Sequence, residues 1–200
     1  DFDAVVGIGD ISYSTGYGAV QHEWARDFAP VGARRLFAIN LGNHESDAMN
    51  VDLERLGRPT TSPYNWTDSG GECGVLADGF IPMPWESKDK PWFSFDVGPI
   101  HIVLMDSEHG LHPTLGPEQR TWLEKDLKSV DRESTPWVVL GIHRPFYVDS
   151  NYRGTPTSDW GTGKHLRAMY EDLLIKYKVD LVIQGHNHAV QRTAAVARTR

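Results

Sequence analysis

Four short runs of apolar residues in this chain each lead directly into a loop that carries polar side chains. The runs cover residues 4–8, 36–41, 137–142 and 181–184. Each run is rich in β-type residues, and the first, at 4–8, is short and continuously apolar, which is typical of a strand that is buried on both faces. The pattern therefore predicts four strands, each delivering a polar loop at its carboxyl end.

The segments between these runs have other periodicities. Apolar residues spaced three and four apart predict helices over 20–28, 117–130 and 164–178, with a short helix at 51–56. An alternating segment at 92–97 and an apolar run at 100–105 flank Gly98-Pro99, which predicts a hairpin. A further strand is predicted at 189–197. Strands mixed with helices indicate a layered α/β sandwich, and 200 residues suit one domain.

Residues 50–91 break the pattern and predict a long irregular excursion over the site. The segment holds five of the twelve prolines and, with its flank, Trp66, Trp85 and Trp92. We interpret these tryptophans as core or domain-contact residues, and the alternative is that they stack on a nucleotide base.

Composition narrows the choice of partners. The net charge of −7, from 27 acidic and 20 basic residues, gives no support for nucleic-acid binding. No apolar run approaches the ~20 residues that a membrane span requires.

The single cysteine, Cys73, cannot form an internal disulfide, and is either a half-buried thiol or pairs outside the chain. Asn65 begins an N-glycosylation sequon. The chain starts inside a strand, so we expect both ends to be cut from a longer protein.

The polar loops carry residues that bind metals. In open α/β sheets, ligand sites lie beyond the carboxyl ends of the strands. Taken singly, each residue has an ordinary structural explanation, such as a helix cap, an Asx turn or a core histidine. Taken together, they predict one site for more than one metal ion, built from Asp10, Tyr13, Asn43, His44, His143, His186 and His188.

The chemistry of these residues suits a pair of ions. A carboxylate such as Asp10 can bridge two cations, and a phenolate from Tyr13 is a hard donor that suits Fe(III). Alternating His186 and His188 on an extended loop point to opposite sides, so that one can reach each ion.

The order of the motifs resembles that of the purple acid phosphatases, a branch of the metallophosphoesterases. The motifs are Gly-Asp-x-x-Tyr at 9–13, Gly-Asn-His-Glu at 42–45, the histidine that closes a strand at 143, and Gly-His-x-His at 185–188. The resemblance runs from residue 3 to about 196 and is closest to large secreted plant and protist members. It implies an αββα four-layer sandwich with mixed sheets, incomplete at both ends. An N-terminal β-sandwich domain and further C-terminal sheet would lie outside residues 1–200.

The resemblance also implies roles for the loop residues. The site would hold Fe(III) beside a divalent ion, which would be Fe, Zn or Mn. Asp10 would bridge the ions. Tyr13 and His188 would bind Fe(III), with the tyrosinate giving the purple colour. The divalent ion would be held by Asn43, His143 and His186. His44 would lie near the scissile phosphate and donate a hydrogen bond or a proton.

The chain departs from the family pattern in three places. A further metal aspartate, in an Asp-x-Gly loop on the preceding strand, has no counterpart here, so an isolated fragment can be inactive. Tyr152 and Arg153 stand where plant members have two adjacent histidines. Arg153 could clamp phosphate, and the alternative is a solvated loop arginine. Leu140 replaces a valine, which is conservative in a buried strand.

The leading hypothesis is hydrolysis of a small phosphate monoester by metal-bound hydroxide, with an acidic optimum. One alternative is phosphodiester or nucleotide pyrophosphate hydrolysis at the same metals. An alternative of another class is a non-catalytic structural or adhesion module. The resemblance implies a glycoprotein that is secreted to the extracellular space or cell wall. Further contacts are expected with other domains of a longer chain or with a homodimer partner.

Overall fold

The computed structural model describes residues 2–46, 69, 75–87, 90–108, 115–149 and 159–195. In chain order its elements are β1 (Ala4–Ile8), α1 (Gly18–Gly32), β2 (Leu36–Asn40), α2 (Val75–Phe80), β3 (Phe93–Val97), β4 (Ile100–Met105), α3 (Leu115–Ser129), β5 (Trp137–Ile142), α4 (Asp159–Lys176) and β6 (Leu181–Gln184).

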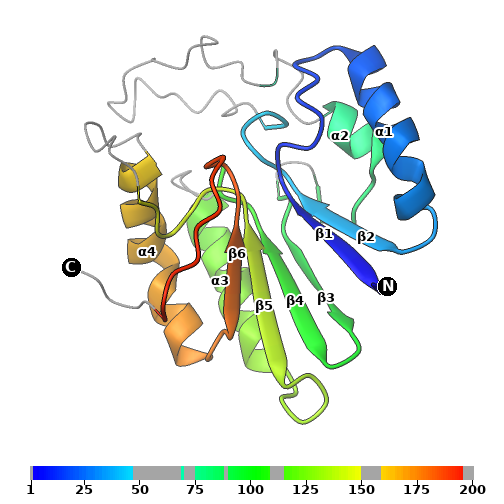
Figure 1. Cartoon of the computed structure of the whole chain (residues 1–200). Helices are drawn as coiled ribbons and strands as arrows, with labels where there is room; N and C mark the ends of the chain where they lie inside the picture. Colours follow the sequence, from blue (N-terminus) through cyan, green and yellow to red (C-terminus); the bar gives the residue numbers. More distant parts are fainter. Residues whose placement is uncertain are drawn as a thin grey trace.

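The strands form two sheets. β1 and β2 pair in parallel, with Val6 opposite Ala38. The second sheet has the order β3-β4-β5-β6, in which β3 and β4 form the predicted antiparallel hairpin and the remaining pairs are parallel. Because β1, β2, β5 and β6 run the same way, the loops after them gather at one end of the molecule (Figure 1).

Two apolar clusters hold the layers together. Helices α3 and α4 cover one face of the four-stranded sheet through Leu123, Leu166 and Tyr170, all fully buried. A second cluster joins the sheets, with Ala38 of β2 against Phe93 and Leu104. On the outer face of the two-stranded sheet, Phe28 of α1 packs against Phe37, and α2 lies beside α1 (Figure 1). The order helices, sheet, sheet, helices confirms the predicted α/β fold class.

One local prediction is wrong, the interpretation of two tryptophans agrees with the structure, and several other predictions lie outside the described residues. The strand predicted at 189–197 is wrong for residues 189–195, which form no strand. Val190 is fully exposed there, and no neighbouring strand pairs with the segment. Trp92 is buried in the core and Trp85 is partly buried against the second cluster, which agrees with the interpretation of these two as packing residues. Other predictions lie outside the described residues, namely the helix at 51–56, Asn65, Trp66, Cys73, Tyr152 and Arg153.

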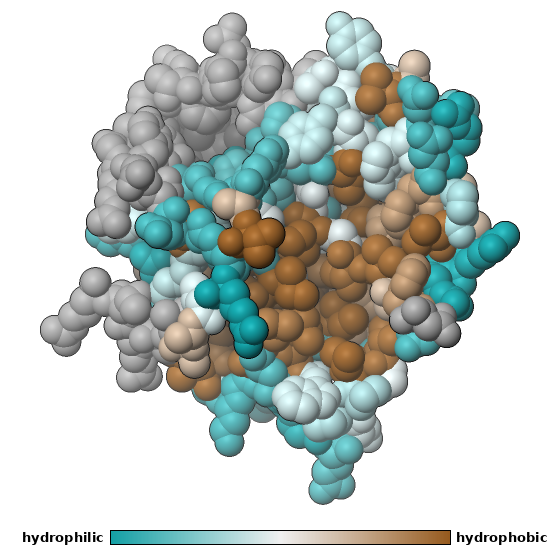
Figure 2. Space-filling model, viewed as in Figure 1, coloured by the Kyte–Doolittle hydropathy of each residue, from teal (hydrophilic) through white to brown (hydrophobic). Residues whose placement is uncertain are grey.

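The face of the four-stranded sheet opposite α3 and α4 is covered by the two-stranded sheet at β3 and β4, but it is apolar and open to solvent at β6. Figure 2, which has the same view as Figure 1, shows hydrophobic residues gathered in the centre of the view, over the strands. Leu181 and Ile183 of β6 point to this face and are 53% and 40% exposed, whereas Val182 between them packs toward α3 and α4. None of the described helices combines the length and apolar character needed to cross a membrane.

A buried histidine on β4 should make stability depend on pH. The ring of His101 contacts two carboxylates, through Nδ1 to Asp96 Oδ1 (2.6 Å) and Nε2 to Asp126 Oδ2 (3.0 Å). The contact with Asp126, then that with Asp96, raises the pKa of His101 although burial opposes the shift. A raised folded-state pKa contributes stability that is complete below the unfolded pKa of ~6.5 and is lost as pH rises through the folded pKa.

We therefore expect His101→Gln to lower the free energy of unfolding by about 1–2 kcal/mol at pH 5.5 and by less at pH 9. Urea unfolding at both pH values measures the difference. His22→Gln, at an exposed position on α1, controls for the loss of a histidine. An equal cost of His101→Gln at both pH values would contradict the assignment.

Candidate metal site

Side chains from the four loops meet at the end of the two sheets. His143 Nε2 lies 3.2 Å from Asp10 Oδ2, 3.0 Å from Asn43 Oδ1 and 3.2 Å from His186 Nδ1. His186 Nδ1 lies 2.9 Å from Asn43 Oδ1. The ligand-type atoms of Asp10, His143 and His186 all lie within 4.8 Å of one another. We call these four residues the His143 group.

A second set shares Asp10 with the first. Tyr13 Oη lies 3.2 Å from Asp10 Oδ2 and 2.8 Å from His188 Nε2. We call Asp10, Tyr13 and His188 the Tyr13 group. His44 lies beside it, with its ring centroid 4.4 Å from that of Tyr13 and its backbone N–H donating to Asp10 Oδ1 (3.0 Å). The structure thus brings together every predicted metal ligand and His44.

The His143 group points acceptor atoms at one another. His143 Nδ1 lies 2.7 Å from the carbonyl oxygen of Ile8, so Nδ1 carries a proton that it donates to Ile8. In the neutral ring this leaves the Nε2 lone pair facing the Asn43 carbonyl oxygen and the Asp10 carboxylate. Lone pairs that converge in this way repel one another unless a proton on Nε2 or a metal cation lies among them, and although burial opposes the shift, the hydrogen bond to Asp10 raises the pKa of His143. This donor set, of imidazole, carboxylate and amide oxygen, fits a divalent transition metal.

Asp10 and Tyr13 differ in how readily each side chain loses its proton. Burial alone would raise the pKa of Asp10, but the hydrogen bond and charge of His143, with help from His44, lower it to about 2. Burial and the Asp10 carboxylate raise the pKa of Tyr13 to about 12. Asp10 is therefore an anion at any physiological pH, whereas Tyr13 needs a strongly charged cation to become a phenolate.

The backbone of the site is held in an uncommon conformation. Asp10, Tyr13 and His186 have φ values of 51°, 51° and 63°, in the left-handed region that non-glycine residues rarely adopt. Such strain persists where the surrounding structure imposes it, and it clusters at functional sites. Gly9 (φ 81°) is required for a further reason, because a Cβ there would lie 2.6 Å from both Gly42 Cα and His143 Nδ1.

Glu45 ties the loops after β1 and β2 together, a role the motif at 42–45 did not reveal. Its carboxylate is 3% exposed and accepts the backbone N–H groups of Asp10 (2.7 Å), Ile11 (2.9 Å) and Gly42 (3.0 Å). Burial raises the pKa of Glu45, although these donors oppose the shift. The carboxylate thereby fixes Asp10 relative to Asn43.

We expect Glu45→Gln to destabilise the chain by about 2–3 kcal/mol, because the amide turns a donor toward backbone donors in a buried site. Urea unfolding measures the cost, and Glu23→Gln on the surface of α1 is the matched control. An unchanged unfolding midpoint would show that the loops do not depend on this carboxylate.

Two charged residues contact the outer edge of His186 and a third binds one of them, and sequence reasoning missed all three. His186 Nε2 lies 3.2 Å from Asp159 Oδ1 and 3.2 Å from Arg144 Nη1. Arg144 Nε in turn donates to both oxygens of Glu108 (2.8 and 2.9 Å). The hydrogen bond with His186 lowers the pKa of Asp159, with burial opposing. Arg144 directly follows His143 in sequence, which is a signal, whereas the position of Asp159 on a helix gives none.

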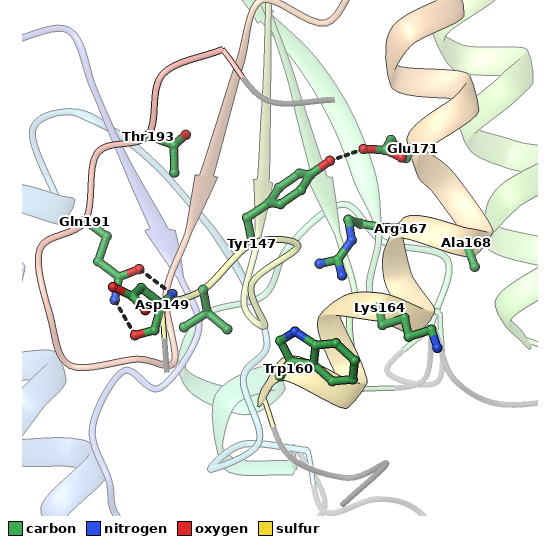
Figure 3. A pocket seen from close by; sticks show the side chains of 10 residues that line it. Tyr147, Asp149, Trp160, Lys164, Arg167, Ala168, Glu171, Gln191 and Thr193 are labelled. Atoms are coloured by element: carbon green, nitrogen blue, oxygen red, sulfur yellow. Dashed lines mark hydrogen bonds between the residues drawn. The ribbon is translucent and has the colours of Figure 1, made fainter. Parts of the chain in front are cut away.

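A cavity of about 650 Å³ borders the segments that carry the site. Figure 3 shows Asp149 hydrogen-bonded to Gln191, which follows His188, on one side of it, and Tyr147 between this pair and α4. Trp160 and Lys164 of α4 close it, and Trp160 is 38% exposed. Its size and aromatic lining suit an organic group of moderate size.

Known proteins share this combination of fold and motifs. Residues 1–190 match the calcineurin-like phosphoesterases. The chain belongs to that family. The structure of a purple acid phosphatase from yellow lupin seeds matches with a TM-score of 0.75 and 33% identity, over 94% of this chain and 31% of that one. The relatives named purple acid phosphatases confirm the resemblance found in the motifs.

The names of the curated relatives differ in what they say about activity. The phosphoesterase chain is 35% identical, over 98% of its length, to a protein from Arabidopsis thaliana named probable inactive purple acid phosphatase 24. It is 30% identical to a nucleotide pyrophosphatase/phosphodiesterase from Hordeum vulgare, over all of this chain. It is 31% identical over 97% of its length to an Arabidopsis Fe(3+)-Zn(2+) purple acid phosphatase. The chain spans 30%, 51% and 38% of these three relatives.

Proposed function

We propose that this phosphoesterase hydrolyses phosphate monoesters at a dinuclear centre of Fe(III) and a divalent ion. The observation that carries the proposal is that Asp10 is shared by the His143 group and the Tyr13 group. One anionic residue between two ligand sets is the arrangement that a bridged pair of cations requires. The Arabidopsis relative named for Fe(3+) and Zn(2+) supports the choice of ions.

The residues of the two groups would divide the ions between them. The Tyr13 group would hold Fe(III), because it supplies the phenolate oxygen that a hard cation prefers. The His143 group would hold the divalent ion through two imidazoles, an amide oxygen and Asp10. When bound, such a pair activates water as a nucleophile and offsets charge on both the attacking and leaving oxygens.

His44 is the residue of this chain placed to handle the leaving group. Its backbone N–H is tied to Asp10, and its ring lies against Tyr13 rather than within either ligand set. A ring fixed beside the centre can donate a proton to the departing alkoxide. The donation requires a proton on the ring, so we expect hydrolysis to be faster in acid than in alkaline solution.

Hydrolysis of a nucleotide pyrophosphate is a second candidate, favoured by the cavity in Figure 3. Trp160 offers an exposed ring on which a base could stack, and Lys164 Nζ lies 5.8 Å from the centroid of that ring. The relative from Hordeum vulgare carries this activity in its name. Rates on a phenyl phosphate and on a nucleotide diphosphate, each with Trp160→Ala, separate the candidates. A selective loss on the nucleotide favours the second.

A non-catalytic module is the third candidate, because the names of several relatives include the word inactive. Metal analysis of purified protein, together with hydrolysis assays on the same sample, tests the proposal. We expect about two ions per chain, and activity that falls on chelation and returns with iron plus zinc. A folded chain that neither retains ions nor hydrolyses the ester would support the module instead.

A further inference from the structure

The two nitrogens of His186 face different surroundings. Nδ1 points into the His143 group, 2.9 Å from Asn43 Oδ1 and 3.2 Å from His143 Nε2. Nε2 points outward, 3.2 Å from Asp159 Oδ1 and 3.2 Å from Arg144 Nη1. A neutral imidazole has one N–H and one lone pair, so its surroundings decide which nitrogen can bind a metal.

The two outer partners require opposite tautomers. Arg144 can only donate, so a hydrogen bond from Nη1 needs the lone pair on His186 Nε2 and places the proton on Nδ1, toward the other ligands. Asp159 can only accept, so its hydrogen bond needs the proton on Nε2 and leaves the Nδ1 lone pair directed into the His143 group. Only the tautomer that Asp159 favours can bind an ion at Nδ1.

The geometry points to Asp159 as the positioning residue that selects the metal-binding tautomer of His186. This inference rests on the proposed role of His186 as a ligand. Both carboxylate oxygens take part, because Oδ2 also accepts from the Nδ2 amide of Asn187 (3.4 Å). Asp159 thereby holds two consecutive residues of the loop between β6 and His188. A carboxylate behind a metal-binding histidine also makes the imidazole a stronger donor.

A simpler role for Asp159 is to start α4, whose first residue it is. An acidic residue in the first turn stabilises a helix, and asparagine can serve as a helix cap. The roles differ in one respect. Asparagine can preserve the start of the helix but lacks the charge that draws the proton to Nε2. Stability and metal affinity should therefore respond differently to Asp159→Asn.

The test uses Zn²⁺ alone, with affinity measured by competition against a chelator. Asp159→Ala should weaken binding by roughly 10–100-fold. Asp159→Asn should unfold at the same urea concentration as the wild type yet still bind Zn²⁺ more weakly. Asp172→Ala, which removes an exposed acid of the same helix, is the control and should leave affinity unchanged. In Zn²⁺-loaded wild type, nitrogen-15 spectra should show the His186 proton on Nε2.

The inference is overturned if Asp159→Ala binds Zn²⁺ as tightly as the wild type, if Asp159→Asn restores affinity and stability together, or if the proton lies on Nδ1. These results leave the proposed hydrolysis standing. A wild type that binds Zn²⁺ through His186 but hydrolyses no phosphate ester would refute the proposed function alone. A wild type that binds no Zn²⁺ would overturn the inference, and one that in addition hydrolyses no phosphate ester would refute both.

Discussion

Asp10→Asn is expected to remove the ability to hold two ions together and to lower phosphate ester hydrolysis by roughly 10³-fold or more, equivalent to about 4 kcal/mol of lost transition-state stabilisation. The reason is that Asp10 belongs to both ligand groups. Its Oδ2 lies 3.2 Å from His143 Nε2 and 3.2 Å from Tyr13 Oη. Asparagine keeps the size of the side chain but offers one neutral oxygen in place of a shared negative charge.

The negative charge of Asp10 contributes more to ion binding than its contacts with His143 and Tyr13. The pKa of Asp10 is lowered to about 2, because hydrogen bonding and charge from His143 outweigh the effect of burial. The carboxylate is thus an anion before any ion arrives, and Asp10 itself has no proton to release when an ion binds. Without that anion, a second cation next to the first would meet uncompensated repulsion. Occupancy should fall from about two ions to one or none.

Metal content and hydrolysis rate, measured on one preparation, check this prediction, and circular dichroism shows whether the variant folds. Asp27→Asn, at an exposed position on α1, is the control and should keep both ions. If Asp10→Asn retained two ions and full activity, Asp10 would not be a bridge, and the pairing of the two groups would have no functional meaning.

Sequence patterns were sufficient for the strands that carry the site. β1, β5 and β6 have the bounds predicted from their apolar runs, because a run of β-type apolar residues is a clear signal even where, as in β6, one face of the strand is exposed. The convergence of Asp10 with Asn43, and of His143 with His186, also follows from the sequence, because the parallel strands of one sheet bring their carboxyl ends to one edge. The meeting of the two pairs depends on the packing of one sheet against the other.

The contacts that Glu45 and Asp159 make around the site could not be predicted from the sequence in this way. Glu45 acts on backbone atoms more than thirty residues away, and Asp159 meets His186 across twenty-seven positions. No periodicity links such pairs, because they depend on how a loop and a helix end are placed in space. The prediction of a strand after His188 was wrong for the opposite reason. The sequence pattern of this segment favours a strand, but a strand forms only where a neighbouring strand can form backbone hydrogen bonds with it.

Tyr13→Phe should abolish the visible absorption of the iron-loaded protein while leaving binding at the His143 group intact. The phenol oxygen lies 2.8 Å from His188 Nε2 and 3.2 Å from Asp10 Oδ2, and neither contact involves Asn43 or His186. Phenylalanine preserves the ring, including its packing 4.4 Å from His44. Only the donor oxygen is lost, so the expected loss is confined to Fe(III).

The raised pKa of Tyr13 adds a dependence on pH. Burial and the Asp10 carboxylate raise this pKa to about 12, so the phenol is protonated throughout the physiological range. Binding of Fe(III) as a phenolate complex must therefore displace one proton. Affinity for Fe(III) should fall about tenfold for each unit by which pH falls, from this proton alone.

Absorption spectra and iron content, measured between pH 5 and 8, test both expectations for Tyr13→Phe. Tyr17→Phe is the matched control, because Tyr17 lies in the same loop and is 71% exposed. If the colour survived in Tyr13→Phe, the chromophore would lie elsewhere and the Tyr13 group would not be the ferric site. Loss of colour with Zn²⁺ affinity retained would establish that the two groups bind separately and that Asp10 alone couples them.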